Sequence, residues 1–183
     1  MHGMLSDRNP CENYMRIDLD ADSLVGSRIN MLLKRTNTLV LNMFRLRDAL
    51  NLLDTECCVN LKYLELNHCH ALEYVIACIV LPVLESLTIQ GAEMLKEICH
   101  GEDLLPVGSR KQLSKLSLSN LPSLTNFWKI ESQPEYLRNL RSVEVCSCER
   151  LKSLFQLPGA SNLKELETVD IQNCRDWKRF LLA

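Results

Sequence analysis

One spacing of apolar residues recurs five times along this chain of 183 residues. The copies start at Leu61, Leu84, Leu113, Leu140 and Leu166, and in each copy apolar residues or Cys stand 0, 3, 5, 8, 11 and 14 residues after the start. A pattern that returns every 23 to 29 residues constrains the fold strongly. Each copy must form the same structural unit and bury its apolar side against its neighbours.

The spacing within one copy predicts the structure of that unit. Counting from the first leucine as offset 0, the apolar residues at offsets 3 and 5 alternate with polar ones, which predicts a short strand. At offset 8, where Cys69, Cys148 and Cys174 stand, we expect the chain to turn inward and a thiol to satisfy backbone groups. The copy length lies within or at the edge of the leucine-rich-repeat range. The predicted fold class is α/β: a leucine-rich-repeat solenoid with a curved parallel sheet on its concave side and an irregular or short helical convex side.

Ahead of the first clear copy the pattern weakens. Leu39 and Leu41 fit offsets 3 and 5 of a copy that would start at Thr36, and residues 14–19 alternate over the length of one strand. We therefore expect one or two degenerate repeats besides the five clear ones. The predicted organisation is a degenerate N-terminal segment at residues 1–30, with a strand at 14–19, and the solenoid at residues 31–183.

Composition excludes several classes of partner. Lys and Arg total 21 against 23 Asp and Glu, a net charge of -2, so no basic excess is available for a nucleic acid. The uncharged stretch at residues 74–84 is too short to cross a bilayer and contains Pro82, so no membrane span is predicted. Residues 1–13 hold no apolar signal region, which favours a cytoplasmic protein.

Cysteine and histidine clusters are the candidates for metal or redox chemistry. His68-Cys69-His70 and Cys99-His100 resemble metal ligands, but the chain has no Cys-x-x-Cys and the repeat already explains Cys69. Cys146 stands at offset 6, on the outward sheet face, and Cys148 stands at offset 8, in the inward slot, which disfavours a redox pair. A solenoid offers an open surface rather than a pocket, so we expect no enzyme, no metal and no cofactor.

Three stretches, residues 31–41, 84–116 and 121–128, resemble recurring sequences in the leucine-rich-repeat region of plant intracellular nucleotide-binding leucine-rich-repeat (NLR) disease resistance proteins of the coiled-coil class. The similarity runs from about residue 14 to about residue 180. It implies a protein-recognition module of an innate immune receptor. Its partner would be a pathogen effector, an effector-modified host protein or a nucleotide-binding switch domain. The chain has no Gly-Lys pair and so no phosphate-binding loop, which predicts a fragment or truncated member.

The concave sheet face is the predicted protein-binding surface, because every repeat presents its residues at offsets 2, 4 and 6 there. The middle row of the five clear repeats holds three carboxylates, Glu65, Glu144 and Asp170, and no base. This acidic stripe would suit a basic partner patch, although ordinary solvated positions explain it equally well. The full predicted face is Tyr63, Glu65, Asn67, Ser86, Thr88, Gln90, Lys115, Ser117, Ser119, Ser142, Glu144, Cys146, Thr168, Asp170 and Gln172.

Two further hypotheses stay open. A leucine-rich-repeat substrate adapter of an F-box ubiquitin ligase also uses Cys at offset 8, but its repeats typically continue with Thr-Asp, where the first copy here has Glu73-Tyr74. Residues 1–23 also contain no apolar helical bundle that could form an F-box. An inactive structural remnant is the other hypothesis. Because no polar capping repeat follows Phe180, the last position of the fifth copy, we also expect self-association through the uncapped C-terminal end.

Overall fold

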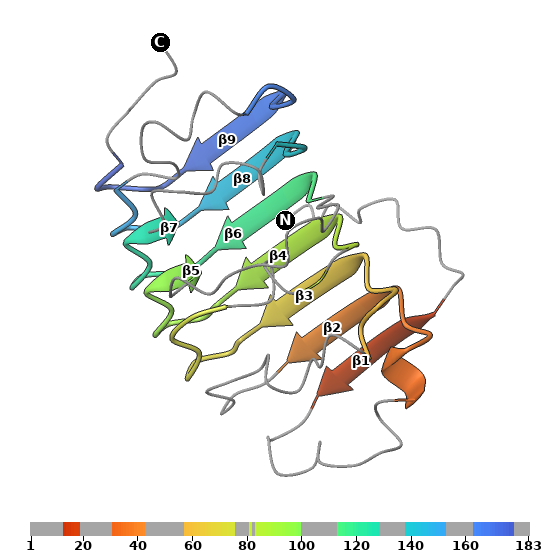
Figure 1. Cartoon of the computed structure of the whole chain (residues 1–183). Helices are drawn as coiled ribbons and strands as arrows, with labels where there is room; N and C mark the ends of the chain where they lie inside the picture. Colours follow the sequence, from red (N-terminus) through yellow and green to blue (C-terminus); the bar gives the residue numbers. More distant parts are fainter. Residues whose placement is uncertain are drawn as a thin grey trace, which may run out of the picture.

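The computed structural model of the chain describes residues 13–18, 31–42, 57–75, 81, 83–99, 113–128, 138–152 and 163–177. The strands within these ranges are β1 (Tyr14–Asp18), β2 (Thr38–Asn42), β3 (Tyr63–Asn67), β4 (Ser86–Gln90), β5 (Glu97–Cys99), β6 (Lys115–Ser119), β7 (Asn126–Trp128), β8 (Ser142–Cys146) and β9 (Thr168–Gln172). Seven of them form one parallel sheet in the order β1-β2-β3-β4-β6-β8-β9 (Figure 1). Because spatial order follows chain order, the chain is a leucine-rich-repeat solenoid, as its spacing predicts.

The sequence period becomes the register of the sheet. Each clear repeat forms its strand from offset 2 to offset 6, and neighbouring strands pair at equal offsets. Leu64 of β3 lies opposite Leu87 of β4, which lies opposite Leu116 of β6. Equal register keeps every apolar column continuous from repeat to repeat, so one core runs the length of the sheet.

The sheet continues ahead of the clear repeats through β2 and β1. Leu39 of β2 pairs with Leu64, and Met15 of β1 pairs with Leu39. Thr36 occupies offset 0, where the clear repeats have leucine, and it is buried with 4% of its surface exposed. Its hydroxyl donates a hydrogen bond to the Leu32 carbonyl at 2.9 Å. That bond satisfies the only polar atom of the side chain, so threonine fits an otherwise apolar position.

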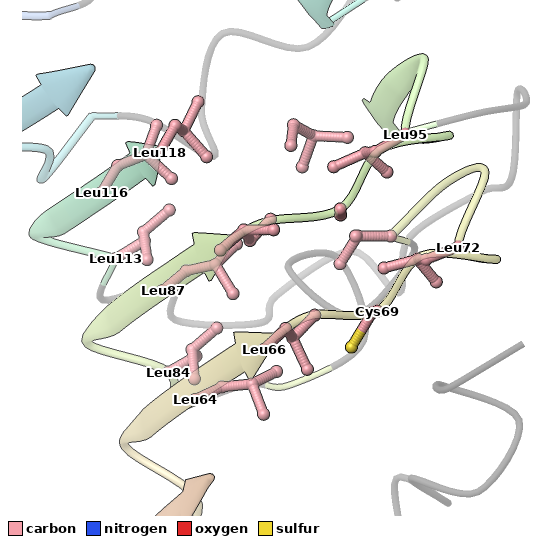
Figure 2. Packing of buried hydrophobic residues seen from close by; sticks show 14 of the residues in the cluster. Leu64, Leu66, Cys69, Leu72, Leu84, Leu87, Leu95, Leu113, Leu116 and Leu118 are labelled. Carbon is pink, nitrogen blue, oxygen red and sulfur yellow. The ribbon is translucent and has the colours of Figure 1, made fainter. Parts of the chain in front are cut away.

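The core consists of the inward side chains at offsets 0, 3, 5, 8, 11 and 14. In the first four clear repeats every described residue of this set is buried, with exposures from 0 to 6%. Figure 2 shows Cys69 among these leucines, with its sulfur on the core side. Full burial of one such aliphatic side chain stabilises the fold by about 1.5–3 kcal/mol. The fifth repeat is more open, because Val169 of β9 is 48% exposed and no described strand follows it in the sheet.

The convex side of the solenoid contains two short strands. β5 and β7 pair in parallel, with Glu97 opposite Asn126, and Tyr74 forms an isolated bridge to Glu97. The backbone N–H of Val75 also donates to the Ile98 carbonyl at 2.9 Å. Stacking brings offsets 13 to 15 of successive repeats into register. This part of the convex side is therefore extended rather than irregular or helical.

Each strand of the five clear repeats is followed by a residue in the left-handed backbone region. At offset 7 the φ angles lie between 54° and 67°, on His68, Gly91, Asn120, Ser147 and Asn173. This left-handed conformation points the N–H of His68 toward the next repeat, where it donates a hydrogen bond to the Gln90 carbonyl at 2.8 Å. At offset 8 the thiol of Cys148 then donates to the Cys146 carbonyl at 3.5 Å. The thiol therefore satisfies a backbone group at the strand end, as the sequence predicts.

Candidate protein-binding face

The outward side chains of the seven-stranded sheet form one surface, which we call the solvent face. Side chains alternate between the two sides of a strand, so offsets 2, 4 and 6 point away from the core when offsets 3 and 5 point into it. The structure places the whole residue set predicted from the sequence on this face, in three parallel rows. These rows cross the strands at right angles and give the face its order.

The carboxylates of the middle row do not form a continuous acidic stripe. Glu144 forms an ion pair with Lys115 of the neighbouring row, with Oε1 and Nζ 3.0 Å apart. Glu65 accepts a hydrogen bond from the Asn67 amide, and Asp170 accepts one from the Gln172 amide, each at 2.9 Å. Lys115 therefore compensates one of the three charges and leaves Glu65 and Asp170 on strands far apart in the sheet.

β1 and β2 extend the solvent face beyond the predicted residues. Arg16 lies in the middle row and forms an ion pair with Asp18, with its Nε 2.8 Å from Oδ2. This hydrogen bond raises the pKa of Arg16 and lowers that of Asp18, whose carboxylate also accepts a bond from the Asn42 amide. The alternation at residues 14–19 indicated a strand, but only the register shows that Arg16 shares a row with Glu65.

The same end of the solvent face carries its largest apolar groups. Tyr14 and Tyr63 stand two strands apart in the offset-2 row and are 56% and 45% exposed. Val40 lies in the middle row of β2 and is 3% exposed, although it is not part of the core cluster. By contrast, β4 and β6 present mainly small hydroxyl groups, such as Thr88 and Ser117. The face therefore changes along the solenoid from aromatic and apolar to small and polar.

Ion pairs between equal offsets line the edge where the strands begin. Lys62 Nζ lies 2.9 Å from Glu85 Oε1, and the pKa of Lys62 is raised by that hydrogen bond. Three repeats further on, Arg141 pairs with Glu167 at 3.2 Å. The hydroxyl of Tyr63 also donates to Glu85 at 3.3 Å. Opposite charges at offset 1 thus join the first clear repeat to the second and the fourth to the fifth.

Comparison with known proteins adds a family to this geometry. Residues 35–175 match the family model described as plant disease resistance protein RPS2-like, leucine-rich repeats. The chain belongs to this family. The match covers β2 to β9 and confirms the resemblance found in the sequence, while β1 lies outside the matched residues. No curated protein and no solved structure gave a match.

The thiols of this RPS2-like leucine-rich repeat lie in different environments. Cys146 is half-buried on the solvent face, with its sulfur 3.5 Å from the Ser147 hydroxyl. Cys148 lies in the core, where burial raises its pKa to about 12, although the Leu121 N–H partly opposes this. A thiol with this pKa is protonated at neutral pH and is a poor nucleophile.

Cys174 stands at offset 8 of the last repeat of this RPS2-like sheet and is only half-buried. Burial raises its pKa as well, and its thiol donates to the Gln172 carbonyl at 3.3 Å. The sequence places it in the same inward column as Cys148, and the structure agrees. Its greater exposure arises because no described strand packs beyond β9.

Of the candidate metal ligands in the RPS2-like repeats, the structure describes His68, Cys69 and His70. His68 and His70 stack loosely, with ring centroids 6.1 Å apart, and His70 lies 3.4 Å from Glu93 of the next repeat. Among the described residues no group of three or more His, Cys, Asp or Glu side chains could hold a metal ion. The Cys99 side chain and His100 lie outside the described residues. None of the helical segments that the structure describes is long and apolar enough to cross a membrane.

Proposed function

We propose that this chain is the protein-recognition module of a plant disease resistance receptor and that it binds its partner through the solvent face. Membership of the RPS2-like family supports the proposal that the chain is part of a disease resistance receptor. The observation that carries the binding site is the register of the seven parallel strands, which aligns the outward residues of every repeat into one continuous surface. Such extended surfaces are what solenoid proteins use to bind other proteins.

The chemistry of the face favours a partner that offers apolar contacts at the β1–β3 end. Exposed tyrosines are frequent anchors of protein interfaces, because a ring buries a large area and its hydroxyl can still form hydrogen bonds. Tyr14 and Tyr63 are the exposed aromatic residues of this end. The paired charges of Arg16 and Asp18 provide a polar border. A pathogen effector, an effector-modified host protein and a nucleotide-binding switch domain remain the partner classes in this proposal.

The proposal also includes the setting of the chain. We take it to act in the cytoplasm in the defence response, without a nucleotide-binding domain of its own and without catalysis. The absence of a Gly-Lys pair supports the first of these two exclusions. The family match favours the receptor over the F-box adapter, because the matched model describes disease resistance proteins.

A two-hybrid screen tests the proposal, with this chain as bait against a library of pathogen effectors and the nucleotide-binding domains of RPS2-like receptors. We expect a specific partner whose binding weakens about tenfold or more in Tyr63→Ala, as for other interface anchors. Tyr74→Ala is the matched control, because Tyr74 is similarly exposed, at 37%, but lies on the convex side. Equal binding by the two variants and the unchanged chain would refute the proposed face.

A further inference from the structure

The inward residues of β9 are more exposed than those of the other six strands of the sheet. Val169 is 48% exposed, whereas Val143, its neighbour at the same offset in β8, is fully buried. Ile171 and Cys174 are likewise only partly buried. In a solenoid these columns are covered by the repeats on both sides. The β9 edge therefore lacks a neighbour on one side within the described residues.

The outer edges of β1 and β9 present the same backbone donors and acceptors that hydrogen-bond two neighbouring strands inside the sheet. At the β8–β9 junction the N–H of Ser147 donates to the Gln172 carbonyl, and the N–H of Thr168 donates to the Arg141 carbonyl, each at 2.9 Å. The equivalent groups on the outer side of β9 are the Asn173 N–H and the Glu167 carbonyl. On the outer side of β1 they are the Asp18 carbonyl and the Tyr14 N–H. Donors and acceptors therefore occur in complementary order on the two edges.

Side chains match in the same register. If β1 followed β9 as the next strand of a parallel sheet, Val169 would lie opposite Met15 and Ile171 opposite Ile17, which continues both apolar columns. Asp170 would lie opposite Arg16. This pairing repeats the opposite charges at equal offsets that join Lys62 to Glu85 and Arg141 to Glu167 within the chain.

Asp170 also has an electrostatic reason to face a base. Within the sheet its direct neighbour is Glu144, a like charge, and Glu144 is compensated by Lys115 on the far side. Like charges on directly opposed strand residues are unfavourable, and opposite charges are favourable. Arg16 is exposed, with 54% of its side chain open, and its partner Asp18 is 55% open. The guanidinium therefore has donors available for a second carboxylate.

We propose that a second copy of this chain adds to the first head to tail, with β9 of one copy paired in parallel with β1 of the next. The contact joins two different edges and is therefore heterologous, so it leaves one edge of each kind open for further copies. The solvent face stays free and becomes continuous from one copy to the next. This assembly is independent of the proposed recognition function.

Sedimentation velocity of the full chain over a concentration series tests the assembly. We expect a concentration-dependent series of oligomers. Asp170→Arg and Arg16→Glu should each weaken the association about tenfold, because each places like charges at the junction. Glu65→Arg is the matched control, since it makes the same charge change in the same row but on β3, inside the sheet. It should assemble like the unchanged chain.

Mixing the two edge variants identifies the edges. The Arg16→Glu chain keeps an intact β9 edge, and the Asp170→Arg chain keeps an intact β1 edge. In an equimolar mixture both junctions carry opposite charges, because Asp170 of one chain meets Arg16 of the other and the introduced arginine meets the introduced glutamate. The mixture should therefore recover the oligomer series, while each variant alone associates weakly. A monomeric unchanged chain, a Glu65→Arg chain that dissociates as readily as the edge variants, or a mixture that associates no better than the separate variants would overturn the proposal.

Discussion

A single residue at offset 7 reverses the backbone at the end of each strand in the five clear repeats. The positive φ at this position costs an ordinary L-residue about 1–2 kcal/mol, and Gly and Asn adopt it most easily. The five repeats use His68, Gly91, Asn120, Ser147 and Asn173, so no residue type marks the turn in the sequence. The hydrogen bond from the reversed N–H to the next repeat, as in Gly91 to Ser119 at 3.0 Å, offsets the cost. Contacts with the next repeat therefore stabilise this turn. The spacing of apolar residues within one repeat could not predict the positive φ angle for that reason.

Gly91 is the one glycine of this set, and a side chain added there would meet a neighbour. A Cβ added there would lie 3.0 Å from His68 Nδ1. We expect Gly91→Asn to lower the free energy of unfolding by about 1 kcal/mol, because the His68 ring must move. Urea unfolding measures the change.

Two control variants separate this contact from the backbone angle. Ser147→Asn makes the same turn residue in another repeat and should be nearly neutral, since its φ of 55° is already adopted by Asn173 and Asn120. In a His68→Ala background the cost of Gly91→Asn should largely vanish. A cost that persists in that background would mean that backbone strain, not the ring, is responsible.

The buried thiol of Cys148 predicts how stability depends on alkaline pH. Its pKa rises from 9.0 to about 12 on folding, mainly through burial. Above pH 9 the unfolded chain ionises this thiol while the folded chain keeps it protonated, so the free energy of unfolding falls as pH rises toward 12. Between pH 8 and pH 10.5 we expect a loss of about 1–2 kcal/mol from this group.

Urea unfolding at both pH values, compared between the unchanged chain and Cys148→Ala, isolates this contribution. The variant is less stable overall but should lose less stability between the two pH values. Cys146→Ala is the control, because Cys146 lies two residues away on the solvent face. If all three proteins lose the same amount, Cys148 does not set the alkaline limit.

At the scale of the strands, two strands with the same sequence pattern differ in stability when different numbers of repeats pack against them. β8 and β9 have the same alternation and pair residue by residue, yet the inward residues of β8 are fully packed and those of β9 are half-open. The stability of a strand in this solenoid therefore depends on whether repeats stack on both sides of it.

Val143→Ala and Val169→Ala test this difference with one chemical change at one offset. Val143 is fully buried, so its truncation should cost about 2 kcal/mol, close to the transfer energy of the side chain. Val169 is 48% exposed, so its truncation should cost less than half of that. Thermal unfolding in the presence of the Asp170→Arg change keeps the chain monomeric for the comparison. Equal costs would show that β9 is covered in solution.

Much of the sheet could be read from the sequence, because aliphatic spacing and strand alternation are local signals. Leu39 and Leu41 placed β2 correctly, and the rows of the solvent face followed from the five clear repeats. β5 and β7 could not be foreseen, since Glu97 and Asn126 show no alternation and pair only after the repeats stack. The acidic stripe was overestimated for a similar reason, because Lys115 and Glu144 lie 29 residues apart in the chain. The binding role of the face stays a prediction.

At the scale of the whole molecule the solenoid is a linear array in which every repeat contacts only its neighbours. Such arrays lose structure from their weakest end rather than all at once. The seven-stranded sheet has its best-packed strands in the middle, at β3, β4 and β6, and its most exposed strand at β9.

Hydrogen exchange should follow this order. Amides of β4 should exchange most slowly and those of β9 fastest, because opening β9 exposes little additional apolar surface. Mass spectrometry of the Asp170→Arg variant, compared at several exchange times, measures the monomer. Uniform protection from β3 to β9 would indicate all-or-none unfolding and contradict a linear array.

The direction of the ladder hydrogen bonds has a mechanical consequence. Strands lie across the solenoid, so the bonds between them run along its length (Figure 1). Tension applied between β1 and β9 therefore acts parallel to these bonds and is carried in full by every junction between strands, so the weakest junction opens first. A partner that binds both ends of the solvent face would therefore be attached to an extensible sheet. Its β8–β9 junction should open first, because Val169 of β9 is exposed and contributes little buried area.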